Sequence, residues 1–411
     1  MQDSNAVKAL LDWAQSPLSL KFPYSATLNE TRRCGKHFMD QAVLEALDHA
    51  RRCAAARCRD SDVDGFLKKF LDVVLDKYDQ KYNYITYTAL PLLEHMRLDG
   101  TEEANPRLLQ HIHDVAVCSI ISDTLRFELN HLGGGHSYLT EMRPDAKLGE
   151  RRLKYALRSI EPSLIRLGFG EISDQVPVPI IAEQVIKFCS AQQLAHSQFV
   201  LDVSMMPVYV VHDEHLFIRI LQALDTTFVS VSSLLRCALR AFDGEFQKTS
   251  EFILAANGIL QEGLKHFLTL STMQKDSFNT FREYTTGASA IQSVNYKIME
   301  SLCRRPDKDR LESLAYGSVP ALQQVLRQGS TSLDEKLAEL RRKEVKDTAI
   351  VRSIEAVMLQ LAETMTRWRH SHYGIAKKYL GKGMGTGNTE GTPYLKMVKD
   401  IPVFTSVSPA L

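Results

Sequence analysis

The sequence predicts a mostly α-helical protein, and three observations favour that fold class. Apolar residues recur every three or four positions over long stretches, which is the spacing of one face of a helix. Serine–acid capping pairs and glycine clusters stand at the ends of several stretches, as expected for helix termini. Only one region, residues 171–211, departs clearly from this pattern.

The N-terminal half is predicted to contain three amphipathic helices. The first covers residues 61–78 and begins at a capping pair, Ser61 and Asp64. The second covers residues 107–132 and ends at a run of glycines. The third covers residues 150–167 and stops at another glycine-containing segment.

Residues 171–211 are predicted to hold either short strands or buried loop. The segments concerned are Val176–Pro179, expected to be extended, and the candidate strands Phe199–Leu201 and Val208–Val211. We place a domain boundary here. Residues 1–207 would form a helical N-terminal region of unknown role, and residues 208–411 a second helical domain.

The C-terminal half returns to helical periodicity. Its first helical segments are residues 216–228, residues 247–274 and a run starting at Ser289. The last segment begins at a capping pair, Ser332 and Glu335, and contains no glycine or proline until Gly374. The charged run Arg341–Lys346 could bend it into two helices.

Composition argues against several classes of protein. With 411 residues, 44% of them hydrophobic, the chain can bury a large core. Its net charge of +1, without a basic cluster interleaved with aromatics, argues against nucleic acid and membrane surfaces as partners. Seven cysteines without a CxxC pair indicate reduced thiols in a cytoplasmic protein. We expect no signal peptide and no transmembrane segment.

One helix face near the C-terminus carries a histidine within an apolar stripe. The stripe consists of Leu361, Met365, Trp368, His372, Ile375 and Tyr379. A buried histidine bonded to the backbone would fit the same spacing. No second His, Cys, Asp or Glu lies at ligand spacing on this face, which disfavours zinc or non-haem iron. A single histidine on an apolar wall is what a haem iron needs as its axial ligand.

Two further segments could contact a small ligand. Gly385, Thr386 and Gly387 belong to a glycine-rich run that lacks a nucleotide-binding fingerprint. The run is either a flexible tail or a loop whose backbone approaches a ligand closely. Arg282 stands among aromatic residues beside Glu283, and it either forms a surface ion pair or captures a carboxylate.

Together these segments resemble the tryptophan 2,3-dioxygenase superfamily of haem enzymes, over residues 208–404. Four landmarks occur in the family's order, namely HDEHLF (212–217), FREYTTGASAIQS (281–293), WRHSH (368–372) and GTGNTEG (385–391). The segment YITYTALPLL (84–93) has a weaker similarity to the family's N-terminal element. The resemblance implies a helical bundle that carries haem in the C-terminal half.

The resemblance also implies roles for the matched residues. His372 would be the proximal ligand of haem b. Arg282 would bind the carboxylate of an aromatic amino-acid substrate, and Thr386 would assist there. The residues expected around the substrate are Phe217, Leu221, Leu224, Phe278, Arg282, Gly385, Thr386 and Gly387. Family members use O2 to cleave the indole C2–C3 bond of tryptophan, and they form tetramers, so a homo-oligomer is expected.

The sequence departs from the family at the distal side of the haem. Leu221 stands where tryptophan dioxygenases carry a histidine, and Leu224 where they carry a tyrosine. Neither leucine can exchange a proton with a substrate. Asn388 replaces a glycine of the GTGG motif, and Ala290-Ile291 replaces Gly-Phe. A histidine from the N-terminal region could take the missing position.

Three functions are consistent with these residues. The first is a haem-dependent oxygenase acting on tryptophan or a related indole or aromatic amino acid, by dioxygenation or, as an alternative, by monooxygenation in a biosynthetic pathway. The second is a non-catalytic haem-based sensor, which the apolar distal side would suit. The third is a helical scaffold without haem, although burying Arg282 in an empty pocket would be costly.

Overall fold

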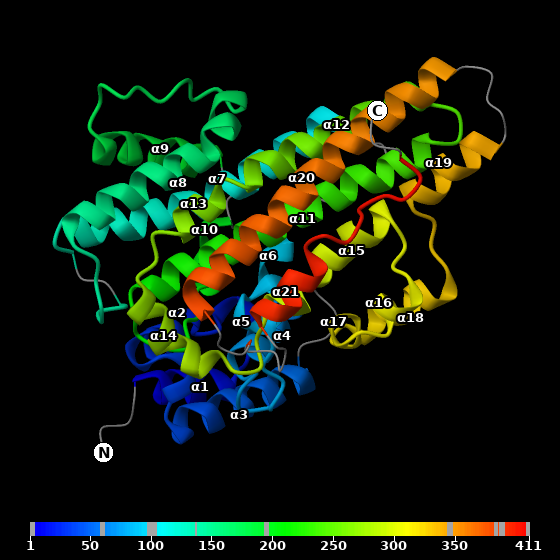
Figure 1. Ribbon diagram of the computed structural model, residues 1–411. Helices are drawn as coiled ribbons and strands as arrows, with labels where there is room; N and C mark the ends of the chain where they lie inside the picture. Colours follow the sequence, from blue (N-terminus) through cyan, green and yellow to red (C-terminus); the bar gives the residue numbers. More distant parts are fainter. Residues whose placement is uncertain are drawn as a thin grey trace.

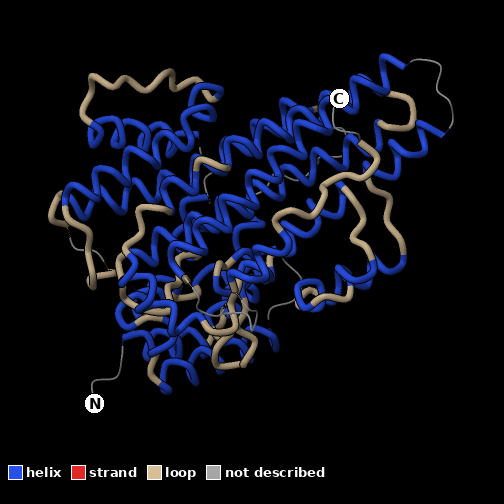
Figure 2. The backbone as a smooth tube through the Cα atoms, in the orientation of Figure 1, coloured by secondary structure: helices blue, strands red, loops and turns tan. Residues whose placement is uncertain are grey.

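The computed structural model describes residues 5–57, 62–96, 105–135, 138–192, 197–342, 348–381, 385 and 391–407. Within these ranges the chain forms helices joined by loops, and no strand is present (Figures 1 and 2). One isolated bridge joins Glu141 to Val211. The predicted mostly α fold is confirmed.

The centre of the fold is α11 (Asp213–Ala241), a helix that is buried along most of its length. It packs on α7 (Pro106–Leu132), α12 (Phe246–Gly263) and α15 (Val294–Cys303). By length and composition α11 could cross a membrane, but 78% of its most apolar window is buried inside the protein. It is therefore the core helix around which the others assemble.

The longest described helix, α20 (Thr348–Leu380), packs along α12, and the two run beside α11 in Figure 1. The short α21 (Thr392–Val398) then returns across α20. The other helices of the C-terminal half are α13 (His266–Leu270), α14 (Lys275–Arg282), α16 (Lys308–Leu311), α17 (Leu314–Gly317), α18 (Pro320–Gln328) and α19 (Leu333–Arg342).

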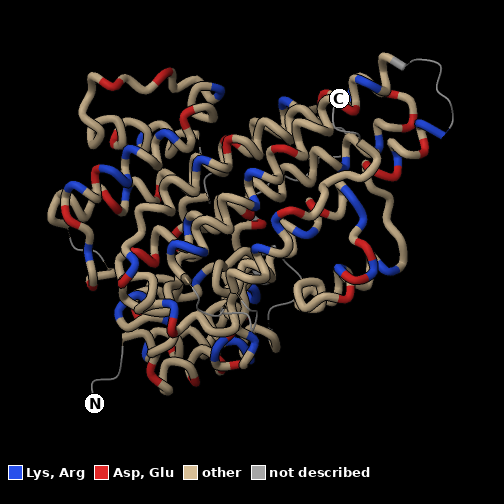
Figure 3. The backbone as a smooth tube through the Cα atoms, viewed as in Figure 1, with Lys and Arg blue, Asp and Glu red and all other residues tan. Residues whose placement is uncertain are grey.

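The N-terminal helices cover one end and one side of this bundle. They are α1 (Asn5–Gln15), α2 (Tyr24–Cys34), α3 (Gln41–Arg57), α4 (Asp62–Val74), α5 (Tyr84–Tyr87), α6 (Leu90–Leu93), α8 (Ala146–Arg166), α9 (Val178–Gln192) and α10 (Ser197–Val203). One hydrophobic core runs through both halves, from Leu10 to Phe404. Lys and Arg are interspersed with Asp and Glu over the described helices (Figure 3).

Buried ion pairs join α7 and α8 to the start of α11. The guanidinium of Arg152 is fully buried, with one nitrogen 3.1 Å from Glu128 and the other 2.6 Å from Asp213. His212 lies 3.3 Å from the same Glu128 carboxylate. Each charge is compensated by a partner, which is the condition for burying it. The HDEH segment is therefore a structural junction between the two halves of the chain.

A second buried pair secures the next turn of α11. His215 Nε2 lies 3.3 Å from Asp123, which also accepts a hydrogen bond from Arg219. Burial lowers the pKa of His215 to about 4. The ring of Phe127 stacks on His215 at 3.9 Å. This histidine is consequently neutral, and it is held by the ring of Phe127 on one face and by Asp123 at Nε2.

Two helices predicted in the N-terminal half, residues 107–132 and 150–167, are confirmed as α7 and α8. The helix predicted over residues 61–78 is α4, which ends earlier, at Val74. Its predicted cap, Ser61, lies outside the described residues.

The predicted extended segments are largely wrong. Phe199–Leu201 lies within α10, and α9 begins at Val178, inside the segment predicted to be extended. Residues 208–211 form buried loop, which was the alternative interpretation. Apolar runs of three or four residues are too short to show a period, so tertiary packing decides their structure.

The capping pair at the last long segment is confirmed. Glu335 N–H donates to Ser332 Oγ at 3.3 Å, and Ser332 N–H donates to Glu335 Oε2 at 2.9 Å. The segment forms two helices, α19 and α20, as the charged run suggested. The run predicted over residues 247–274 is also divided, into α12 and α13. The run predicted from Ser289 begins with one 3₁₀ turn and continues as α15.

Acid should destabilise this fold through its buried histidines. Burial lowers the pKa of His113 to about 3 and that of His266 to about 4, as for His215. The unfolded chain protonates these rings near pH 6.5, so it binds more protons than the folded chain below that pH. We expect the free energy of unfolding to fall between about pH 6.5 and 4, by up to about 1.4 kcal/mol per pH unit for each histidine.

Urea unfolding at several pH values measures this slope. His266→Gln should reduce it, whereas His111→Gln, at an exposed position, should leave it unchanged. A free energy of unfolding independent of pH over this range would contradict the assignment of these histidines as neutral.

Candidate functional site

A cavity of about 210 Å³ lies between α11, α14, α15, α20 and α21. Its walls are mainly aromatic and aliphatic, with a few cationic and hydroxyl side chains among them. The space is bounded on one side by α11 and on another by α20, so the packing of these two core helices sets its shape.

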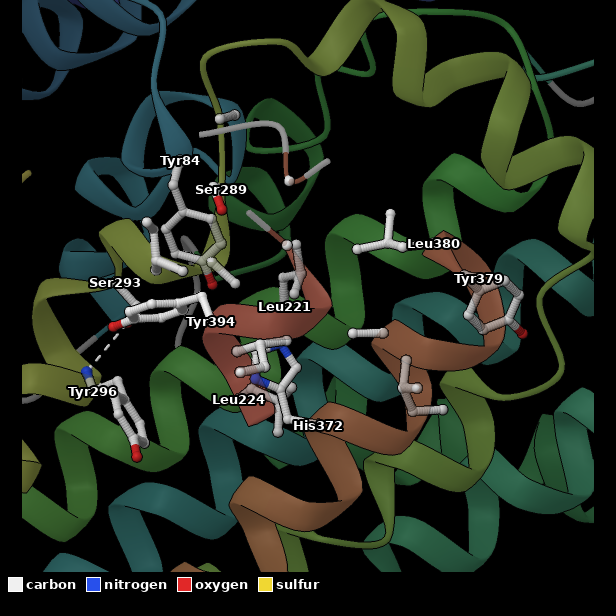
Figure 4. A pocket seen from close by; sticks show the side chains of 18 of the residues that line it. Tyr84, Leu221, Leu224, Ser289, Ser293, Tyr296, His372, Tyr379, Leu380 and Tyr394 are labelled. Atoms are coloured by element: carbon white, nitrogen blue, oxygen red, sulfur yellow. Dashed lines mark hydrogen bonds between the residues drawn. The ribbon is translucent and has the colours of Figure 1, made fainter. Parts of the chain in front are cut away.

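The structure brings most of the sequence-predicted site residues to this one cavity. They are Phe217, Leu221 and Leu224 from α11, Phe278 and Arg282 from α14, His372 from α20, and Gly385. Figure 4 shows the side chains of Leu221, Leu224 and His372 directed into the same space. Thr386 and Gly387 lie outside the described residues, as does Asn388.

His372 presents a neutral imidazole to the cavity. Burial lowers its pKa to about 4, so one ring nitrogen keeps a lone pair at neutral pH. The rings of Trp368 and Phe267 stand 5.2 and 6.4 Å away. Within the described ranges no residue hydrogen-bonds the imidazole, so the alternative of a backbone-bonded core histidine finds no partner there.

These residues fit a haem held through one histidine. The donor is a neutral nitrogen on an apolar wall, which is the arrangement an axial ligand requires. Trp368 Nε1 is a buried donor that has no hydrogen-bond partner in the described part of the chain. Across that same part, no group of three or more His, Cys, Asp or Glu could hold a metal ion. The donor set therefore suits a prosthetic group better than a bare ion.

Arg282 is placed by the docking of α14 on α11. Phe281 is fully buried, and its ring lies 5.4 Å from Phe217 and 5.5 Å from Phe278. Gln274, the residue that precedes α14, donates its backbone N–H to the Asp213 carboxylate at 2.5 Å. Partial burial lowers the pKa of Arg282, but a guanidinium stays charged at any physiological pH. A fixed cation therefore faces the cavity beside aromatic rings.

The N-terminal region contributes two tyrosines that sequence reasoning did not assign to the site. Tyr84 and Tyr87 of α5 both line the cavity. The Tyr84 hydroxyl donates to the buried carboxylate of Asp225, one position after Leu224 on α11. In the sequence, the one indication that these tyrosines belong to the site is the weak similarity of the YITYTALPLL segment to the family.

No histidine of the N-terminal region lines the cavity in the described ranges. His131 instead packs against His212, with ring centroids 4.8 Å apart, and its Nε2 lies 3.0 Å from the Pro144 carbonyl. His136 lies outside the described residues. On the α11 side, the wall at Leu221 and Leu224 is therefore apolar.

Helix α21 covers another part of the cavity. Tyr394 points into it (Figure 4), and its hydroxyl lies 3.4 Å from a guanidinium nitrogen of Arg310. Thr392 Oγ1 donates to the carbonyl of Gly381 at 3.0 Å, which ties the start of α21 to the end of α20. Sequence reasoning missed this element because its seven residues are too few to show a period.

Comparison with known proteins identifies relatives of about half of the chain. No protein-family model matches it. The tryptophan 2,3-dioxygenase of Erythrobacter litoralis is 27% identical over 256 residues, covering 51% of this chain and 94% of that protein. Those of Burkholderia ambifaria and Burkholderia pseudomallei are 25% and 22% identical over 229 and 227 residues, each covering 47% of this chain and 74% of the relative. This chain is thus a distant relative of the tryptophan 2,3-dioxygenase superfamily, as its sequence motifs indicate.

Proposed function

We propose that this protein is a haem-dependent oxygenase that uses O2 to cleave the indole C2–C3 bond of tryptophan or a related indole amino acid. One observation carries the proposal: a neutral histidine and a fixed arginine cation line the same apolar cavity. The relatives named tryptophan 2,3-dioxygenase support the reaction class.

Each side chain would have a definite task. A bound haem would supply the O2 chemistry. His372 would hold that group through its free ring nitrogen, and Arg282 would fix the substrate by its carboxylate through two parallel hydrogen bonds. The rings of Phe217 and Phe278, whose centroids are 5.8 Å apart, would pack against the aromatic part of the substrate. Together these contacts would orient the substrate and exclude water.

A second candidate is monooxygenation of an aromatic amino acid by the same cofactor. The apolar wall favours it, because Leu221 and Leu224 are both nearly buried and offer no group that could accept a proton from an indole N–H. Dioxygenation here would have to proceed without a side-chain base at those two positions. The mass of the product separates the two reactions.

Replacing His372 should remove the haem. We expect His372→Ala to lose at least about 90% of its haem content, or to change the haem spectrum, because it removes the side chain that would hold the haem iron. The matched control is His370→Ala, two positions earlier, whose imidazole is 48% exposed and bonded to Asp400. It should keep full haem. Pyridine haemochrome assays on the purified proteins measure both contents.

An unaltered haem spectrum in His372→Ala would show that another residue is the ligand. Equal haem loss in both variants would indicate a general defect of α20 instead.

Replacing Arg282 should weaken substrate binding without affecting haem. We expect Arg282→Ala to bind L-tryptophan about 10- to 100-fold less tightly, as for a lost charge-assisted pair of about 1.5–3 kcal/mol. The affinity of Arg282→Lys for L-tryptophan should lie between those of Arg282→Ala and the wild type, because lysine keeps the charge but lacks the planar guanidinium that forms two parallel hydrogen bonds. Lys275→Ala, an exposed position on the same helix, is the control. Optical titration of the haem band measures the affinities, and unchanged affinity in Arg282→Ala would rule out this carboxylate contact.

A further inference from the structure

Lys297 of α15 is a buried ammonium group that lines the cavity. The residue is 3% exposed, and its Nζ donates a hydrogen bond to the carbonyl of Ile291. The ring of Tyr316 lies 5.9 Å from Nζ. In the described part of the chain, no carboxylate comes within ion-pair distance of it. Burial lowers its pKa to about 8, as expected for an ammonium without a close counter-ion.

The carboxylate of Glu300, which acts on Lys297 from a distance, is already bound by other groups. It accepts two hydrogen bonds from Arg310, at 2.9 and 2.8 Å, and one from Arg369 at 2.9 Å. The hydroxyl of Tyr316 donates to it as well, at 3.1 Å. Glu300 is thus shared by two guanidinium groups and cannot also neutralise the lysine.

The second carboxylate in range, Asp225, is also engaged. It accepts hydrogen bonds from Tyr84, from Ser293 Oγ at 2.9 Å and from Asn295 Nδ2 at 3.1 Å. Among the described residues, the charged groups that act on Lys297 are Glu300, Arg310 and Asp225, and both carboxylates are already bound by other side chains.

Arg282 forms a different cationic site. The charges that influence Lys297 are those of Glu300, Arg310 and Asp225, whereas burial sets the pKa of Arg282. Both residues nevertheless line one cavity. The cavity therefore has cationic side chains at two separate places.

We propose that Lys297 is a second carboxylate-binding subsite of this cavity, separate from Arg282, and that it forms an ion pair with a carboxylate of a bound ligand. The inference rests on the proposed function, which supplies carboxylates of two sources: the propionate side chains of haem and the carboxylate of the amino-acid substrate. In a buried site such a pair is short and strong, because the ammonium has already lost its hydration on folding and forming the pair removes little more.

The test compares wild-type protein with Lys297→Met and Lys297→Arg. Methionine keeps the length of the side chain and removes the charge, and arginine keeps the charge. The control is Lys308→Met, since Lys308 is exposed and is not among the residues that line the cavity. Each protein is loaded with haem or with haem dimethyl ester, whose propionates carry no charge. Two readouts are taken: the rate at which each porphyrin leaves for excess apomyoglobin, and the affinity of the loaded protein for L-tryptophan.

Two results support the subsite and identify its source. If the partner is a haem propionate, Lys297→Met releases haem at least about tenfold faster than wild type, releases the dimethyl ester at the wild-type rate, and Lys297→Arg restores slow release. If the partner is the substrate, haem release is unchanged and the affinity of Lys297→Met for tryptophan falls about tenfold. Lys308→Met should behave as wild type in both assays.

Two results overturn the subsite. In the first, Lys297→Met matches wild type in both readouts. In the second, it releases haem and the dimethyl ester faster by the same factor, which indicates a purely structural lysine. Failure of the proposed function is distinct, because the wild-type protein itself would then bind neither haem nor tryptophan.

Discussion

The complete burial of Arg152 between Glu128 and Asp213 is the constraint on which the site depends. This guanidinium joins α7 and α8 to the first turn of α11. Asp213 in turn accepts the backbone N–H of Gln274, the residue that precedes α14. One buried carboxylate therefore positions both the helix that carries Leu221 and the helix that ends at Arg282. Removing one partner of such a pair leaves an uncompensated charge and costs about 3–5 kcal/mol, so the geometry of the cavity is tied to the stability of the fold.

The cavity combines an apolar interior with fixed charges at separate places. Its neutral imidazole, His372, is on α20, while the cations Arg282 and Lys297 belong to α14 and α15. Between mainly apolar walls, each charge interacts more strongly with a ligand than it would at the surface. The N-terminal region takes part directly, because Tyr84 lines the cavity and holds Asp225 through its hydroxyl. The site is therefore built by both halves of the chain.

Sequence reasoning predicted the mostly α fold, the long helices and the residues that meet at the cavity, because each had a periodic or motif signal. It did not predict α5 or α21, which are too short for periodicity to reveal, so Tyr84 and Tyr394 were missed. It also expected Phe199–Leu201 to be either a short strand or buried loop, whereas the segment lies in α10, which packs on α6 and α7. The charge balance around Lys297 depends on Glu300, Arg310 and Asp225 meeting in space, and no local pattern encodes that meeting. Thr386 and Gly387 lie outside the described residues, so their roles remain predictions.

The central claim is that His372 and Arg282 hold a haem and an indole amino acid in one cavity. The most direct measurement is an anaerobic optical titration of the purified, dithionite-reduced protein with L-tryptophan, followed by addition of O2 and mass analysis of the product. We predict a histidine-ligated haem spectrum that shifts as tryptophan binds, and a product heavier than the substrate by two oxygen atoms. A haem spectrum that does not respond to tryptophan would contradict the claim for the substrate, and protein without haem would contradict it for the cofactor.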